Sequence, residues 1–102
     1  MHIEYVRSGG FAGIRLAGSF DTEKLPPEQA TTLGNLIDGA RFFRLSDQIK
    51  PTSPVPDQFE YQVTISSAGQ THSVVVGESV VPTDLRPLLD FLTTLTISSK
   101  KR

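Results

Sequence analysis

Residues 59–66 read F-E-Y-Q-V-T-I-S, and this stretch decides the fold. Apolar side chains at positions 59, 61, 63 and 65 alternate with polar ones at 60, 62, 64 and 66. Strict alternation is typical of a strand with one buried side and one side facing water. S-A-G-Q at 67–70 predicts a turn, and T-H-S-V-V-V-G at 71–77 predicts the antiparallel partner strand.

A second hairpin is predicted at the N-terminus. Residues 2–7 and 14–20 both alternate, and S-G-G-F-A-G connects them. Glycines supply the positive φ angles that a hairpin connection requires. Each hairpin is followed by apolar residues at helical spacing, first after two prolines and then after Thr83, the expected N-cap. Gly34 within the first helix should cost about 1 kcal/mol relative to alanine, which close packing against the sheet would explain.

The order of elements predicts an α+β fold, ββαββα, with a four-stranded, mainly antiparallel sheet and helices packed on one face. Three prolines within residues 46–58 favour a loop there. We expect one domain over residues 1–97, followed by a short basic tail at 98–102. The polar residues expected on the open face of the sheet are His2, Glu4, Arg15, Ser19, Glu60, Gln62, Thr64 and Ser73.

The composition is that of an ordinary soluble globular domain. The chain has 102 residues, 37% hydrophobic and 21% charged, and its net charge of −1 argues against a nucleic-acid partner. It contains no cysteine, which excludes disulfides, thiolate metal sites and a cysteine nucleophile. The sequence shows neither a signal-peptide pattern nor an apolar stretch of about 20 residues, so we expect a cytoplasmic protein without a membrane partner.

Candidate catalytic and metal-binding residues are few. His72 adjoins Ser73 in a predicted strand, where neighbours point to opposite faces, so a Ser-His pair is not expected and His72 is interpreted as a surface residue. The sequence lacks an H-x-x-x-H pair or clustered carboxylates for a metal. S-G-G-F-A-G leads into a strand rather than a helix, unlike a phosphate-binding loop. We therefore expect a binding protein that is not an enzyme and has no metal or cofactor.

Four stretches stand out in chain order: S-G-G-F-A-G at 8–13, L-P-P-E at 25–28 with the following helix and F-F-R-L at 42–45, D-Q-F-E-Y at 57–61, and L-R-P-L-L-D-F-L at 85–92. As an ordered set they resemble the emfourin family, bacterial protein inhibitors of thermolysin-like (protealysin-like) metalloproteases. The resemblance implies a reversible, stoichiometric inhibitor that binds the active-site cleft of a zinc metalloprotease inside the cell. We expect the free inhibitor to be a monomer.

We expect the protease contact at Ser8, Gly9, Gly10, Phe11 and Ala12. Thermolysin-like enzymes, as a family, cleave before bulky apolar residues, so Phe11 would fill the pocket for such a residue. Gly9 and Gly10 would let the backbone approach the cleft closely. A purely structural interpretation stays open, in which Phe11 folds back onto the sheet edge and the glycines only make the turn.

Met1 and His2 form a rival contact, because a terminal amine or an imidazole can ligate an active-site zinc. The first strand separates them from the glycine-rich loop by about 20 Å, so both cannot enter one narrow catalytic centre. A second function also stays open: a non-catalytic interaction or regulatory module with a different partner.

Overall fold

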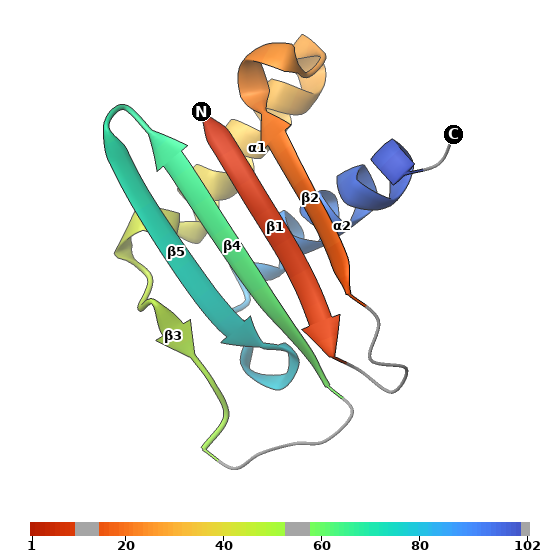
Figure 1. Cartoon of the computed structure of the whole chain (residues 1–102). Coiled ribbons are helices and arrows are strands. Elements are labelled where there is room, and N and C mark those ends of the chain that lie inside the picture. Colours follow the sequence, from red (N-terminus) through yellow and green to blue (C-terminus); the bar gives the residue numbers. More distant parts are fainter. Residues whose placement is uncertain (10–14, 53–57, 101–102) are drawn as a thin grey trace.

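The sheet is centred on the pairing of two strands that lie far apart in the sequence, β1 and β4. The computed structural model describes residues 1–9, 15–52 and 58–100, and in this part of the chain five strands form one sheet in the order β2-β1-β4-β5-β3 (Figure 1). Both predicted hairpins, β1–β2 and β4–β5, are present, and the antiparallel β1–β4 pair joins them. The strands are β1 (His2–Gly9), β2 (Leu16–Asp21), β3 (Gln48–Ile49), β4 (Phe59–Ser67) and β5 (Gln70–Gly77).

The four-stranded sheet and the ββαββα order predicted from the sequence are wrong, because β3 adds a fifth strand. It lies within residues 46–58, which the sequence assigned to a loop, and it makes the sheet mixed. Gln48 stands opposite Val75 in a parallel pair with β5, and the Val75 N–H donates to the Asp47 carbonyl at 2.8 Å. Two residues are too few to show periodicity, and an edge position tolerates the proline that follows at Pro51.

Helix α1 (Pro27–Ala40) begins at the second of the two prolines that the sequence places at its start. A proline suits the first helical position, where its missing N–H would have no intrahelical partner. The helix ends where Arg41 adopts a left-handed conformation with φ 51°, and the Arg41 N–H donates to the carbonyls of Ile37 and Asp38. The 3-10 turns η1 (Thr22–Lys24) and η2 (Phe42–Arg44) flank this helix along the chain.

Helix α2 (Arg86–Lys100) begins three residues after Thr83, the N-cap expected from the sequence. The N–H groups of Leu85 and Arg86 donate to the Pro82 carbonyl at 3.0 and 3.2 Å, so a separate turn leads into the helix. Another 3-10 turn, η3 (Glu78–Val80), follows β5 directly. Neither α-helix of the described residues is long and apolar enough to span a membrane.

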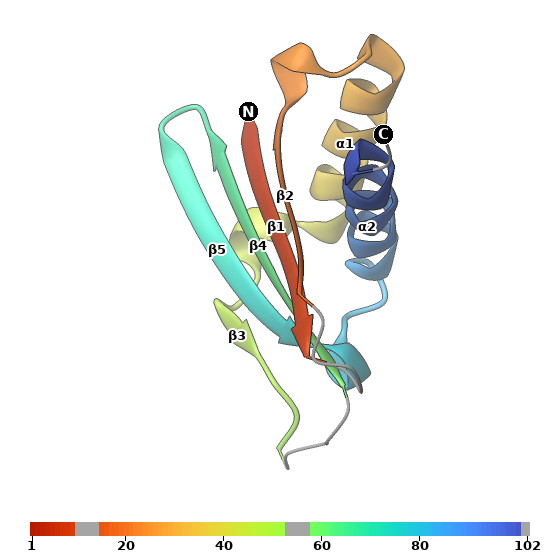
Figure 2. The ribbon, with the colours of Figure 1, turned by 45° about the vertical axis from the view of Figure 1, so that its right-hand side comes forward.

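Both helices cover the same face of the sheet, as the sequence predicts (Figure 2). Their inner residues, such as Leu33 and Leu89, form one hydrophobic core with Ile3, Tyr5 and Ile65 of the central strands. The opposite face is open, and its polar residues confirm the predicted pattern: His2, Glu4, Ser19, Glu60, Gln62 and Ser73 are exposed, and Thr64 is half-buried. Arg15 is exposed too, but it precedes β2 rather than belonging to it.

The glycine that brings helix and sheet together is Gly18, not Gly34. A Cβ built on Gly18 would lie 2.7 Å from Thr96 Oγ1, so α2 approaches β2 across the bare glycine backbone. A Cβ on Gly34 would meet nothing within 4 Å. The expectation that Gly34 serves close packing against the sheet is therefore wrong.

Candidate functional site

The predicted contact loop leaves the sheet at the end of β1. Ser8 is half-buried and pairs with Glu60, and Gly9 is exposed and pairs with Phe59. Gly10, Phe11 and Ala12 lie outside the described residues. The structure thus places the first two predicted contact residues at one end of the central strand pair.

The backbone at Gly9 requires glycine for two reasons. Its φ angle is +90°, which side-chain-bearing residues rarely adopt. A Cβ there would also lie 2.7 Å from the carbonyl oxygen of Gln58, the residue that directly precedes β4. The point where β1 ends therefore lies directly against the point where β4 begins.

Phe59 is held firmly at this end of the sheet. Its N–H donates to Glu78 Oε1 at 2.9 Å, and Arg86 Nη2 donates to the Glu78 carbonyl at 3.2 Å. The guanidinium carbon of Arg7 lies 4.3 Å from the centroid of the Phe59 ring, a cation–π distance. Contacts from η3, α2 and β1 thus fix the base from which the predicted loop extends.

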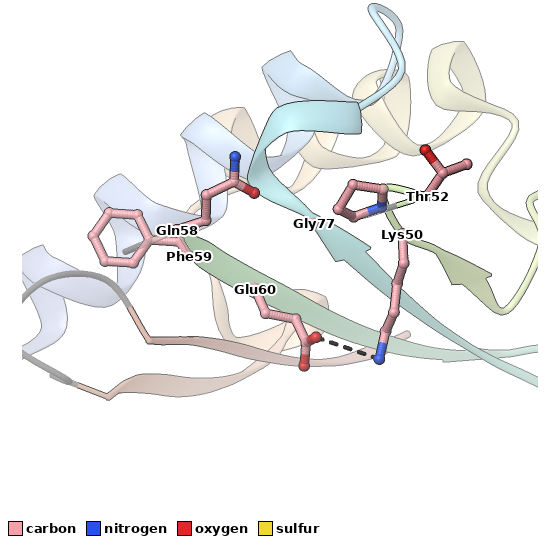
Figure 3. A pocket seen from close by; sticks show the side chains of 7 residues that line it. Lys50, Thr52, Gln58, Phe59, Glu60 and Gly77 are labelled. Carbon is pink, nitrogen blue, oxygen red and sulfur yellow. Dashed lines mark ion pairs between the residues drawn. The ribbon is translucent and has the colours of Figure 1, made fainter. Parts of the chain in front are cut away.

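A hollow of about 440 Å³ lies beside this base, between the end of β3 and the start of β4 (Figure 3). Lys50 Nζ and Glu60 Oε2 form an ion pair across it at 3.5 Å. We call it the sheet-end hollow, and the described residues that line it are Lys50, Pro51, Thr52, Gln58, Phe59, Glu60 and Gly77.

No pattern in the sequence predicts a contact role for the sheet-end hollow. Its one signal was the D-Q-F-E-Y stretch at 57–61, which contributes to the family resemblance and contains Gln58, Phe59 and Glu60. Their proximity to Gly9 depends on the register of β1 against β4, which no local pattern reveals.

Met1 and His2 lie at the other end of β1, near the N label in Figure 1. An eight-residue antiparallel strand spans about 24 Å, so they are far from Gly9. The Met1 carbonyl accepts a hydrogen bond from the Thr22 N–H at 3.0 Å. His2 Nε2 is hydrogen-bonded to Ser19 Oγ at 3.1 Å and lies 3.5 Å from Glu4 Oε2. The structure therefore does not bring the two predicted contact segments together.

His72 is a packing residue rather than the surface residue that the sequence predicts. Opposite Ile65 in the β4–β5 register, it faces the helix side of the sheet. Its Nε2–H donates to the Leu45 carbonyl at 2.8 Å, and its ring lies edge-on to Phe42 with 5.6 Å between centroids. Ser73 is exposed on the opposite face, as strand geometry predicts.

Metal ligands do not cluster in residues 1–9, 15–52 and 58–100: no group of three His, Asp or Glu side chains there could hold an ion. The aromatic and imidazole rings around His72 form a packed connection between β5 and η2.

Comparison with known proteins gives one finding. A family model described as Emfourin matches residues 5–93. The match includes all five predicted loop residues and the whole sheet-end hollow, and it excludes Met1 and His2. Neither the curated proteins nor the solved structures yield a match.

Proposed function

Because the chain belongs to the emfourin family, an inhibitor family, we propose that it is a reversible, stoichiometric protein inhibitor of a thermolysin-like zinc metalloprotease. The family match over most of the chain is the observation that carries this proposal. The inhibitor itself catalyses nothing, and it acts as a cytoplasmic monomer that restrains the protease inside the cell.

The protease contact in this proposal is the loop that begins at Ser8. Gly9 supports the assignment, since its position against Gln58 anchors the loop's first residues to the sheet. A loop whose base is held in place loses less conformational entropy when it binds. Phe11 then fills the pocket that normally receives a bulky apolar substrate residue, and Gly10 keeps the backbone slim enough to enter the cleft.

The N-terminal segment is the weaker choice for this contact. The ring nitrogen of His2 already has Ser19 as a hydrogen-bond partner, and a zinc ion would compete with that bond. Met1 is tied through its carbonyl to Thr22. Both residues also lie outside the family match, so we assign them no role in the catalytic centre.

The test is a titration of residual activity. The purified protein is added in increasing amounts to a thermolysin-like protease at saturating zinc. We expect activity to fall linearly to zero near one equivalent, and excess zinc excludes metal removal as the cause. Undiminished activity against several such proteases would contradict the proposal and favour an interaction module with another partner.

A further inference from the structure

We propose that the sheet-end hollow is a second contact for the same protease, which accepts an uncharged, hydrogen-bonding group from the rim of the active-site cleft. This inference rests on the proposed function and extends its site. It adds two contact residues, Thr52 and Gln58, which lie outside the loop proposed above as the protease contact.

Surface area gives the first reason for a second contact. A stable, specific protein interface buries about 800 Å² on each partner. The predicted loop is five residues, of which two are glycines and one is aromatic. A large aromatic side chain buries about 150–250 Å². A tight complex therefore needs surface beyond the loop.

Position gives the second reason. The Gln58 carbonyl oxygen would lie 2.7 Å from a Cβ on Gly9, so Gln58 directly adjoins the start of the proposed loop contact. Gln58 is itself a wall of the hollow. Helices α1 and α2 both lie on one face of the sheet (Figure 2), and Lys50, Thr52 and Glu60, which line the hollow, are exposed. The hollow is thus continuous with the proposed contact.

The lining gives the chemistry of the occupant. Lys50 and Glu60 already neutralise one another at 3.5 Å, so the hollow offers no uncompensated charge from this pair. Gln58 and Thr52, on opposite sides of Gly77 in Figure 3, contribute an amide and a hydroxyl. These groups can donate and accept hydrogen bonds. For the part of the lining that the structure describes, a neutral polar side chain or a main-chain amide fits better than a charged group does.

Size is consistent with one inserted group. Ligand-binding pockets typically enclose about 300–1,000 Å³, and the hollow, at about 440 Å³, lies within that range. Gly77 lines the hollow, and a Cβ there would lie 3.0 Å from Cδ of Pro51, another lining residue. The hollow therefore depends on a position that carries no side chain.

The absence of cysteine from the chain allows a direct test. Thr52→Cys, Ser8→Cys and Thr71→Cys each introduce a single thiol. Ser8 reports on the proposed loop contact, and Thr71, which is exposed in the other half of β5, is the matched control. The rate of alkylation by iodoacetamide is measured by mass spectrometry, with and without saturating protease.

We expect the protease to slow alkylation of Thr52→Cys about tenfold or more, since interface cores exclude solvent, and to leave Thr71→Cys unchanged. Protection at Ser8→Cys without protection at Thr52→Cys would overturn the second contact and leave the proposed function intact. If the unmodified chain does not inhibit the protease at all, the proposed function itself fails.

A second pair of variants measures the consequence for inhibition. Thr52→Trp fills the hollow from an exposed position, and Thr71→Trp adds the same bulk elsewhere. We expect Thr52→Trp to raise the inhibition constant about tenfold or more, because the indole would exclude the protease from the hollow. Thr71→Trp should leave the inhibition constant unchanged. The two variants should have equal melting temperatures. Equal inhibition by both variants would contradict a contact at the hollow.

Discussion

Gly9 lies directly against the main chain of Gln58: a Cβ on Gly9 would stand 2.7 Å from the Gln58 carbonyl oxygen. These residues are far apart in the sequence, yet they define one end of the sheet, where β1 finishes and β4 starts. The proposed loop contact and the sheet-end hollow meet at this point. A substitution of Gly9 should therefore lower both the stability of the fold and the inhibition of the protease.

Gly9→Ala should destabilise the fold by about 1–3 kcal/mol, because it combines a strained φ of +90° with a main-chain clash. Gly69→Ala is the matched control, since Gly69 has φ +81° but open space around its Cβ position. Urea denaturation gives the stabilities, and the titration described above gives inhibition. We expect the larger loss, and the only loss of inhibition, at Gly9. Equal effects at both glycines would contradict a role for close approach to Gln58.

Gly34→Ala should stabilise the protein by about 1 kcal/mol, because alanine favours the helix and a Cβ at this position meets nothing within 4 Å. Gly18→Ala should destabilise it, since the new methyl group would lie 2.7 Å from Thr96 Oγ1. Thermal unfolding followed by circular dichroism compares the two. A stabilising Gly18→Ala would show that α2 does not need the bare backbone of β2.

Tyr5→Phe should cost about 0.5–1.5 kcal/mol at neutral pH, because it removes the partly buried hydrogen bond between the phenol and Thr93 Oγ1. Thr93 keeps its bond to the Leu89 carbonyl, so it is not left without a partner. Denaturation in urea near pH ~7 measures the loss. No change in stability would mean that the pair contributes nothing beyond packing.

Alkaline pH gives a separate prediction for Tyr5. Burial raises the pKa of its phenol above the ordinary value of 10.0, and the Thr93 hydrogen bond and the Arg7 charge offset only part of the rise. Above a pH of about 10 the unfolded chain releases this proton while the native state retains it, so the free energy of unfolding falls as pH rises toward the native pKa. The fall should be smaller in Tyr5→Phe when unfolding curves are compared across that range. Parallel curves would exclude this linkage.

His72→Ala should destabilise the fold by about 1–3 kcal/mol, because the Leu45 carbonyl loses its donor and the contact with Phe42 is lost. Inhibition should be retained, since His72 packs inside the fold. Ser73→Ala, on the exposed face of the same strand, should change stability by less than about 0.5 kcal/mol. Loss of inhibition without loss of stability in His72→Ala would point to a direct functional role for the imidazole.

Phe11→Ala should raise the inhibition constant about 30-fold or more if the ring anchors the inhibitor in the protease, as hot-spot aromatic residues do. His2→Ala should leave inhibition unchanged, because its side chain lies at the far end of β1. Inhibition constants and melting temperatures are measured for both variants. A Phe11→Ala variant that melts earlier but inhibits normally would favour the purely structural interpretation of this residue.

The predictions that the sequence allowed were those with a local physical cause. Alternation over 59–66 predicts β4 because side chains of a strand point to opposite faces in turn, and the structure confirms it. Proline at the first position predicts the start of α1 because it lacks only an N–H that the helix does not use. The ordered stretches that resemble the emfourin family are likewise a property of the sequence, and the family match confirms them.

Only the tertiary structure decided which distant segments meet. The two-residue strand β3 exists because β5 offers it an edge to pair with. His72 packs against Phe42 and donates to the Leu45 carbonyl because η2 lies next to this part of β5, which no local pattern reveals. Gly9 meets Gln58 because the register of β1 against β4 brings the end of one strand to the start of the other. Pairing between strands depends on hydrogen bonds from main-chain atoms that every residue carries. The sequence therefore determined the two hairpins, the two α-helices and their buried faces. Register and packing determined β3 and which elements became neighbours.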